Sequence, residues 1–281
     1  MRWPAFGAVL CAAQLAAAAE PEEPKPSDVL KPEGLAEIPS PITDRFALRG
    51  TYFSSSIDTE IRLDDPNGTL GTELSAEDDL DMRENLDQGR VEMMLRMRDR
   101  SRVRFDYFKL TRQGDEVLNR PVRFGDETFD TDERVLSLLD WRTLNFTYLY
   151  SVVRNSRFEV GAGLGLHIFN GEARARVPAR LIAEEESGVA PFPTLALDGT
   201  WRISSRFALT GRINHLSADV EDSSGEVSDY HADLQYRWRP NFALGVGYTR
   251  LKTKLAIADS DFPGRFVFDV KGPELFLRAS F

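Results

Sequence analysis

The chain has 281 residues, of which 42% are hydrophobic and 28% are charged, and its formal net charge is −10. No run approaches the roughly 18 apolar residues of a membrane-spanning helix, so the sequence excludes a helical membrane protein. The sequence does not exclude a membrane β-barrel, because barrel strands are apolar on only one face. The negative net charge argues against a nucleic-acid partner.

Residues 1–19 are predicted to form a secretory signal peptide. A short basic start precedes an apolar, alanine-rich stretch, and Ala17-Ala18-Ala19 has the small-x-small form of a cleavage site. Removal of this segment would take away Arg2 and no acidic residue, which changes the net charge from −10 to −11. The only cysteine, Cys11, lies inside the segment, so we expect no disulfide scaffold and no cysteine-based metal site in the mature chain.

Residues 20–43 are predicted to be an extended periplasmic linker, because prolines recur throughout them. These prolines are Pro21, Pro24, Pro26, Pro32, Pro39 and Pro41. From residue 44 to residue 281 the pattern stays the same, so we predict a single domain there.

That pattern has a period of two. In RFEVGAGLGLHIF (157–169), apolar side chains occupy every second position from Phe158 to Ile168, and Glu159, three glycines and His167 share the opposite face. Successive side chains of a strand point to opposite faces, so each such stretch is predicted to be a strand with one apolar and one polar face. Similar stretches occur at 90–98, 195–203, 229–238 and 241–248.

Gly161, Gly163 and Gly165 in the first of these stretches could suggest a phosphate-binding loop. That motif requires a strand followed by a helix, and no helix begins here. We interpret the three glycines as packing devices on the inward face of a strand.

About ten strands are predicted, and eight or twelve remain possible because 69–80 and 121–130 could extend strands or add a pair. The connections are alternately short, at 98–101, 154–157, 204–206 and 239–241, and long, at 63–87, 113–135, 170–191, 218–228 and 257–265. The predicted spans are 45–62, 88–98, 102–112, 136–153, 157–170, 192–203, 206–218, 228–238, 241–256 and 266–281.

A soluble sandwich would also alternate, but two features favour a membrane barrel. The apolar faces often run for five or six positions, which suits the roughly 9–11 residues of a tilted membrane strand. Aromatic residues gather at strand ends, as in the aromatic girdles of membrane barrels; they are Tyr148, Tyr150, Trp201, Phe207, Tyr236, Trp238 and Tyr248. We therefore expect every second side chain from about residue 45 onward to touch hydrocarbon.

The chain ends in PELFLRASF, with Leu275, Leu277, Ala279 and Phe281 on one face. This ending is similar to the C-terminal assembly signal of outer-membrane proteins. Together with the alternation and the signal peptide, it makes residues 44–281 resemble the small OmpA/OmpW-like barrels of bacterial outer membranes. The resemblance implies an all-β, closed antiparallel transmembrane barrel in a Gram-negative outer membrane, inserted by the barrel-assembly machinery and surrounded by lipid and lipopolysaccharide. It implies no solute and no cofactor.

Charged residues on the polar face of the strands are predicted to line the lumen. We interpret them as a plug of paired charges, because unpaired buried charges are costly and narrow barrels are filled by side chains; a narrow channel for small solutes is the alternative. The predicted lumen-lining residues are Glu92, Arg96, Arg102, Arg104, Asp106, Glu159, His167, Asp198, Arg202, Arg212, Asp233, Arg237, Glu274 and Arg278.

The predicted loops are acidic, at 77–87, 125–133, 183–186, 219–226 and 259–261. Carboxylates suit Ca²⁺ and Mg²⁺, so divalent cations are possible partners of these loops, although no loop has the spacing of an EF-hand. Plain solvated loops are the simpler interpretation.

Two classes of enzyme are alternatives to a non-enzymatic barrel. His215 and Ser217, with Asp229 on the next strand, are similar to the motif of PagL-type lipid A deacylases, which would imply a triad for ester cleavage. Ala218 stands where that family has Asn. Omptin proteases are also ten-stranded barrels, and they use an Asp pair that faces an Asp-His pair. The Asp pairs Asp64-Asp65 and Asp78-Asp79 occur in this sequence, but no Asp-His dipeptide does. No histidine cluster suggests zinc, so we expect no metal site and no enzyme activity.

Overall fold

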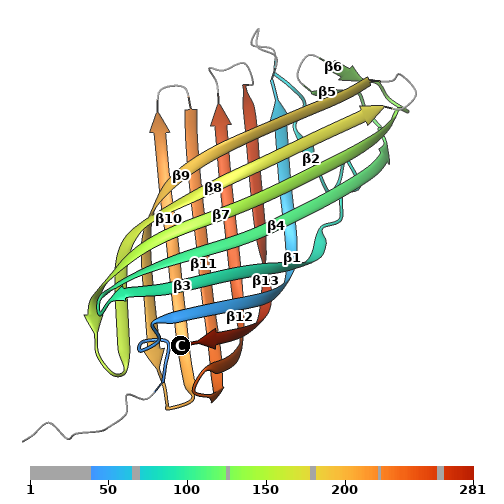
Figure 1. The fold of residues 1–281 in the computed structure, drawn as a ribbon. Coiled ribbons are helices and arrows are strands. Elements are labelled where there is room, and N and C mark those ends of the chain that lie inside the picture. Colours follow the sequence, from blue (N-terminus) through green and yellow to red (C-terminus); the bar gives the residue numbers. More distant parts are fainter. Residues whose placement is uncertain (1–38, 65–69, 125–126, 178–181, 221–222, 258–262) are drawn as a thin grey trace, which may run out of the picture. The chain divides into compact units, whose positions relative to one another are not determined.

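The computed structural model describes residues 39–64, 70–124, 127–177, 182–220, 223–257 and 263–281. The predicted signal peptide and residues 20–38 of the predicted linker lie outside this part. Ten long strands form one antiparallel sheet, and β13 pairs with β1 from Ala47↔Ser280 to Leu63↔Gly264, which closes the sheet into a barrel (Figure 1). The all-β, ten-stranded barrel predicted from the alternation is confirmed. None of the described residues forms a helix that could cross a membrane.

Each long strand pairs with the next long strand along the chain, as in an up-and-down barrel. The short β2 (Leu74–Ser75) pairs with the end of β1, and β5 (Val122–Phe124) and β6 (Glu127–Phe129) form a separate hairpin. The ten strands are β1 (Phe46–Leu63), β3 (Asn85–Arg98), β4 (Ser101–Val117), β7 (Arg134–Arg154), β8 (Phe158–Val177), β9 (Ile182–Arg202), β10 (Phe207–Val220), β11 (Ser223–Arg239), β12 (Phe242–Ile257) and β13 (Gly264–Ser280).

The barrel has two different ends. The turn end carries the predicted short connections, together with Phe46 and Ser280, which begin β1 and end β13. The opposite, loop end differs from the prediction, because much of the expected loop sequence is strand. β8 and β9 continue through most of 170–191, β10 and β11 through most of 218–228, and β4 and β7 extend into both ends of 113–135.

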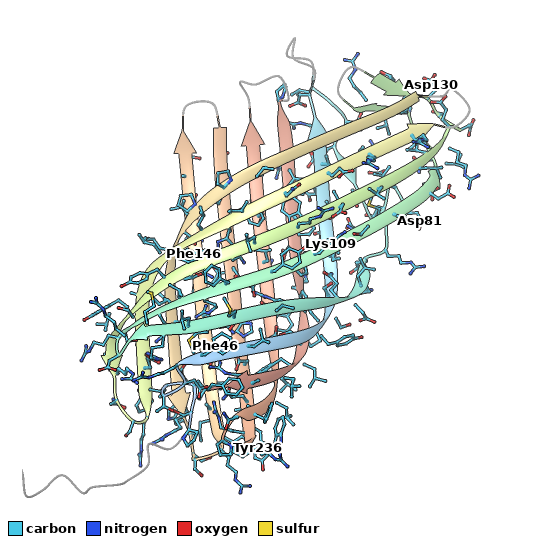
Figure 2. All side chains as sticks on the ribbon, in the orientation of Figure 1. Phe46, Asp81, Lys109, Asp130, Phe146 and Tyr236 are labelled. Atoms are coloured by element: carbon cyan, nitrogen blue, oxygen red, sulfur yellow. The ribbon has the colours of Figure 1, made fainter. Side chains whose placement is uncertain are left out.

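The polarity of the wall reverses about halfway along the strands. In β7, the outward side chains Leu144 and Phe146 are exposed and apolar near the turn end, but Asp140 and Arg142 take their place toward the loop end. The inward side reverses in the opposite sense, from Asn145 to the buried Trp141. Figure 2 labels one residue of each kind on the outer wall, Phe146 in the apolar part and Lys109 of β4 in the charged part.

Other strands reverse at the same level, where tyrosines mark the boundary on the outer wall. Outward Tyr107 is followed by Lys109 in β4, and outward Tyr248 by Arg250 in β12. We call the part nearer the turn end the apolar band and the remainder the charged half. Boundary tyrosines are Tyr52, Tyr107, Tyr230 and Tyr248.

The expectation that every second side chain touches hydrocarbon is therefore wrong for the charged half. There the outward residues are Asp58, Glu60, Lys109, Asp140 and Arg142 among others, which suit water. A wall that is wetted outside has to bury apolar side chains inside, and this half of the barrel does so.

An aromatic core fills the barrel interior at this level. The Trp141 ring lies 4.9 Å from the Phe268 ring, 5.1 Å from Phe266 and 5.3 Å from Phe169, measured between centroids. The aromatic core consists of Phe53, Ile57, Phe108, Leu110, Trp141, Phe169, Val227, Leu251, Phe268 and Val270, with Leu86, Phe192 and Phe266 packed against it.

The turn end is covered by residues 40–44, which the sequence assigned almost entirely to the linker. Ile42 is buried, and the Asp44 carboxylate accepts hydrogen bonds from Arg237 (2.6 Å) and Arg278 (3.1 Å). Arg154 donates to the Ile42 carbonyl at 3.1 Å. The last residues of the predicted linker are thus part of the barrel.

The glycines of β8 face the interior, as expected from their phase. A Cβ at Gly163 would overlap the Tyr148 carbonyl of β7, and one at Gly165 would crowd Thr194 Oγ1 of β9. Glycine is needed at both positions because the backbone of β7 and a side chain of β9 approach β8 closely.

Candidate functional site

Inside the apolar band, a network of ion pairs occupies the barrel interior. Nearest the turn end, Glu159 of β8 accepts two hydrogen bonds from Arg96 of β3, at 2.7 and 2.8 Å, and also contacts Arg102 of β4. Ser151 donates to the same carboxylate. Bidentate arginine–carboxylate pairs are among the strongest side-chain contacts, and all three charged groups are buried.

Asp198 of β9 continues this group around the barrel wall. It contacts Arg102 and accepts a 3.0 Å hydrogen bond from Arg104. Arg104 also lies 3.9 Å from Glu92 of β3, which links this group to the next one.

The central group is organised by two arginines on different strands. Arg49 of β1 donates to Asp233 of β11 at 2.9 Å and contacts Glu274 of β13, and its guanidinium lies 3.5 Å from the centroid of the Phe276 ring. Arg212 of β10 contacts Glu92 across the interior.

His231 of β11 joins these two arginine clusters. Its Nε2 atom lies 2.7 Å from Asp233 Oδ2 and 3.0 Å from Arg212 Nη2. Its Nδ1 atom lies 3.4 Å from Glu274 Oε1. Acids and bases from five strands therefore meet at one level of the barrel.

The third group lies next to the aromatic core, on its turn-end side. Arg90 of β3 donates to Asp106 of β4 at 2.6 Å and lies 4.0 Å from Asp229 of β11, and His167 of β8 lies 3.7 Å from the same Asp229 carboxylate. The void between this group and the aromatic core is about 20 Å³, which is room for about one water molecule.

The fourteen predicted lumen-lining residues can now be placed. Eleven are buried, whereas Arg104, Arg202 and Arg278 are half-buried. Arg202 lies near the turn end and has no side-chain partner among the described residues, whereas the other thirteen take part in the contacts given above. Sequence reasoning missed five lumen-lining residues, Asp44, Arg49, Arg90, Asp229 and His231. The strand phase of all of these except Asp44 places them on the inward face.

The hypothesis of a His215–Ser217–Asp229 triad is wrong. His215 and Ser217 are exposed on the outer wall, whereas Asp229 is buried and faces the interior with the phase of its cross-strand partner Asn214. The His215 Nδ1 atom instead lies 2.9 Å from Ser228 Oγ. A strand separates its two faces by its own thickness, so the three groups cannot act together.

One aspartate of each Asp-Asp pair is bound to an arginine, which does not fit an omptin-like site. Asp64 binds Arg62, and Asp79 binds Arg120 at 3.0 Å. Among the described residues there is no group of three or more His, Cys, Asp or Glu side chains that could hold a metal ion. Parts of the predicted acidic loops, at 125–126, 221–222 and 259–261, lie outside the described residues.

Two hollows open on the outside of the barrel. One, of about 920 Å³, lies in the charged half beside β4, β7 and β8 and is bordered by Arg83, Arg174 and Arg176. The other, of about 720 Å³, lies on the apolar band over β8 to β12.

Comparison with solved structures supports the fold. The outer membrane protease OmpT from Escherichia coli matches with a TM-score of 0.55 and 11% identity, over 89% of this chain and 99% of that one. Ail of Yersinia pestis, solved with a heparin analogue, has 12% identity and a TM-score of 0.35 over 82% of this chain and 98% of that one. A Pseudomonas aeruginosa FadL homologue has 9% identity and a TM-score of 0.38 over 85% and 90%. The sequence matches no protein-family model and no curated protein.

Proposed function

We propose that this chain, whose fold is that of the bacterial outer-membrane β-barrels, is a sealed, non-enzymatic barrel with a structural or binding role. The observation that carries the proposal is the filled interior. Ion pairs from the turn end to Arg90 are followed directly by the aromatic core, and the void between them is about 20 Å³. Ten strands enclose only a narrow lumen, so side chains can fill it.

The apolar band supports placement in a membrane. From Tyr230 to Trp238, β11 presents apolar side chains at every second position over nine residues, all exposed except the half-buried Tyr236. This length is close to the roughly 9–11 residues that a tilted strand needs. A soluble protein rarely exposes an apolar surface of this extent. The tyrosines at one edge and the aromatics Trp201 and Trp238 at the other fit two interfacial girdles.

The same placement gives the barrel a direction. The short turns lie on the periplasmic side, and the charged half projects outside the cell. Leu275, Leu277 and Phe281 present their side chains on the outer wall, where the barrel-assembly machinery could read them. Lipopolysaccharide surrounds the outer edge of the band, and divalent cations shared with the acidic loops belong to the same proposal.

The test is electrical. We expect the refolded full chain in planar lipid bilayers to give no steady conductance steps, because the ion-pair network and the aromatic core both fill its interior. Insertion is checked by the shift of the folded band on an unheated gel, and a general porin under the same conditions provides the positive control. Regular stepwise current from inserted protein would overturn the sealed-barrel proposal in favour of a small-solute channel.

A further inference from the structure

The groove on the apolar band has a floor of small residues. One row across the wall runs Val160↔Gly199↔Gly211↔Ala232↔Tyr248, each residue directly opposite the next on the neighbouring strand. All five have the outward phase. A Cβ added to Gly199 or Gly211 would meet no atom within 4 Å, so the floor is open to the outside.

Large side chains form the two banks of this groove. Trp201, Leu209 and Leu234 lie in the next outward row on one side, and Leu197, Ile213 and Tyr230 in the next row on the other. The strand neighbours Asp198, Arg212 and His231 also border the groove, although their side chains face the interior. At about 3.3 Å per residue, the two bank rows are about 13 Å apart, which leaves width for one hydrocarbon chain.

A cluster of cations lies at the loop-end side of the groove. Arg250 borders it, and Lys271 of β13 is the direct cross-strand partner of Arg250, with both side chains exposed on the outer wall. Like charges directly opposite each other destabilise a sheet. Two outward carboxylates lie beside it: Asp269, which binds Arg250 at 2.6 Å and lies 3.9 Å from Lys252, and Asp58, the direct cross-strand partner of Asp269. Three cations thus meet two carboxylates, so the cluster carries excess positive charge.

We propose that this groove binds one acyl chain of a phosphorylated outer-leaflet glycolipid and that Arg250 and Lys271 bind its phosphate. The small-residue floor from Gly199 through Gly211 to Ala232 spans two inter-strand spacings of about 4.8 Å, or about 10 Å, and Val160 and Tyr248 stand at its two ends. This length holds part of one acyl chain. The hollow and the cations are contiguous at Arg250, so one amphipathic anion can occupy both. This proposal depends on the proposed membrane placement, and it assigns one molecule of the surrounding lipid to a specific binding site.

A lipid fits these features better than a second barrel does. The outer wall of a barrel is convex, so a second copy would rest on the two banks and leave the glycine floor empty. A second copy would also bring an identical cation cluster toward this one if the contact were symmetric, whereas a phosphate neutralises it.

The first experiment fills the groove. The Gly211→Leu variant places a side chain above the floor, where its Cβ meets no atom within 4 Å, and Gly50→Leu is the matched control. Gly50 also faces outward with no atom within 4 Å of its missing Cβ, but it lies between Val91 and Leu277, outside the groove. With lipid A as the probe, we expect native mass spectrometry of the refolded chain to show about tenfold weaker retention for Gly211→Leu and no change for Gly50→Leu.

The second experiment removes the charge. Lys271 forms no ion pair among the described residues, so Lys271→Gln breaks no ion pair and should weaken lipid A retention several-fold. Lys109→Gln at the same level of β4 should leave retention unchanged. Phosphatidylglycerol retained as strongly as lipid A would overturn the glycolipid assignment, and equal weakening by the two control variants would overturn the site. If Gly211→Leu fails to give the folded band, Ala232→Leu tests the same floor. Lipid A retention does not depend on whether the barrel conducts, so the lipid site and the sealed-barrel proposal can fail separately. A chain that does not insert into lipid at all would contradict the membrane placement.

Discussion

Replacing Glu159 by glutamine is expected to lower the free energy of unfolding by about 3–5 kcal/mol, the usual cost of removing one partner from a buried ion pair. Glu159 is the shared acceptor for Arg96 and Arg102 and for the Ser151 hydroxyl. The amide keeps the shape of the side chain but leaves two buried guanidinium groups facing each other. Urea titration of the refolded barrel, followed by tryptophan fluorescence, measures the loss.

The control for this prediction is Asp115→Asn, the same acid-to-amide change at an exposed ion pair. Asp115 pairs with Arg134 in the charged half, where their side chains are 48% and 64% exposed. Solvent screens such pairs, so the urea midpoint should stay where it is. Equal effects of the two substitutions would mean that water reaches Glu159, and the interior of the band would then not be sealed.

Much of the barrel could be predicted from the sequence because the apolar band enforces strict alternation. In β8, every second residue from Phe158 to Ile168 has to suit lipid, so the strand and its phase are visible without a structure. The short turns follow for the same reason, since charged and polar residues interrupt the pattern only where the chain leaves the membrane.

The prediction failed where the strands leave the band. Residues 170–177 continue β8, yet their outward residues Glu172, Arg174 and Arg176 are charged, so the stretch has the composition of a loop. Strands in water need no apolar outer face. The sequence does contain a signal for this change, because the apolar positions switch from one face of the strand to the other. In β4 the large apolar residues are the odd-numbered Phe105 and Tyr107 and then the even-numbered Phe108 and Leu110.

The interior network shows a different limit. Strand phase predicts that Glu92 and Arg212 face inward, but not that they meet, because 120 residues separate them along the chain. Cross-barrel pairing depends on strand number and stagger, which one sequence does not reveal. The triad hypothesis failed for a related reason, since Asp229 lies near His215 in the sheet register but on the opposite face.

Trp141→Ala is expected to cost about 3–5 kcal/mol of unfolding free energy, the range for deleting a large buried aromatic side chain. Trp141 is 4% exposed, contacts three phenylalanine rings and donates a 3.0 Å hydrogen bond from Nε1 to Thr143 Oγ1. Neighbouring strands fix these rings from several directions, so the core can collapse only partly around the cavity.

The matched control is Trp201→Ala in the apolar band, where the indole is 44% exposed on the outer wall and stacks on Phe158. Lipid can fill the space that the Trp201 side chain leaves on the outer wall. The space left by Trp141 is enclosed by the aromatic core, so it stays an empty cavity or takes up water among apolar side chains. We therefore expect the loss at Trp201 to be clearly smaller in the same urea titration. A larger loss at Trp201 would show that the charged half contributes little to stability and that contacts with the membrane hold the barrel together. Bilayer conductance should stay silent in both variants, because the ion-pair network below Trp141 is untouched.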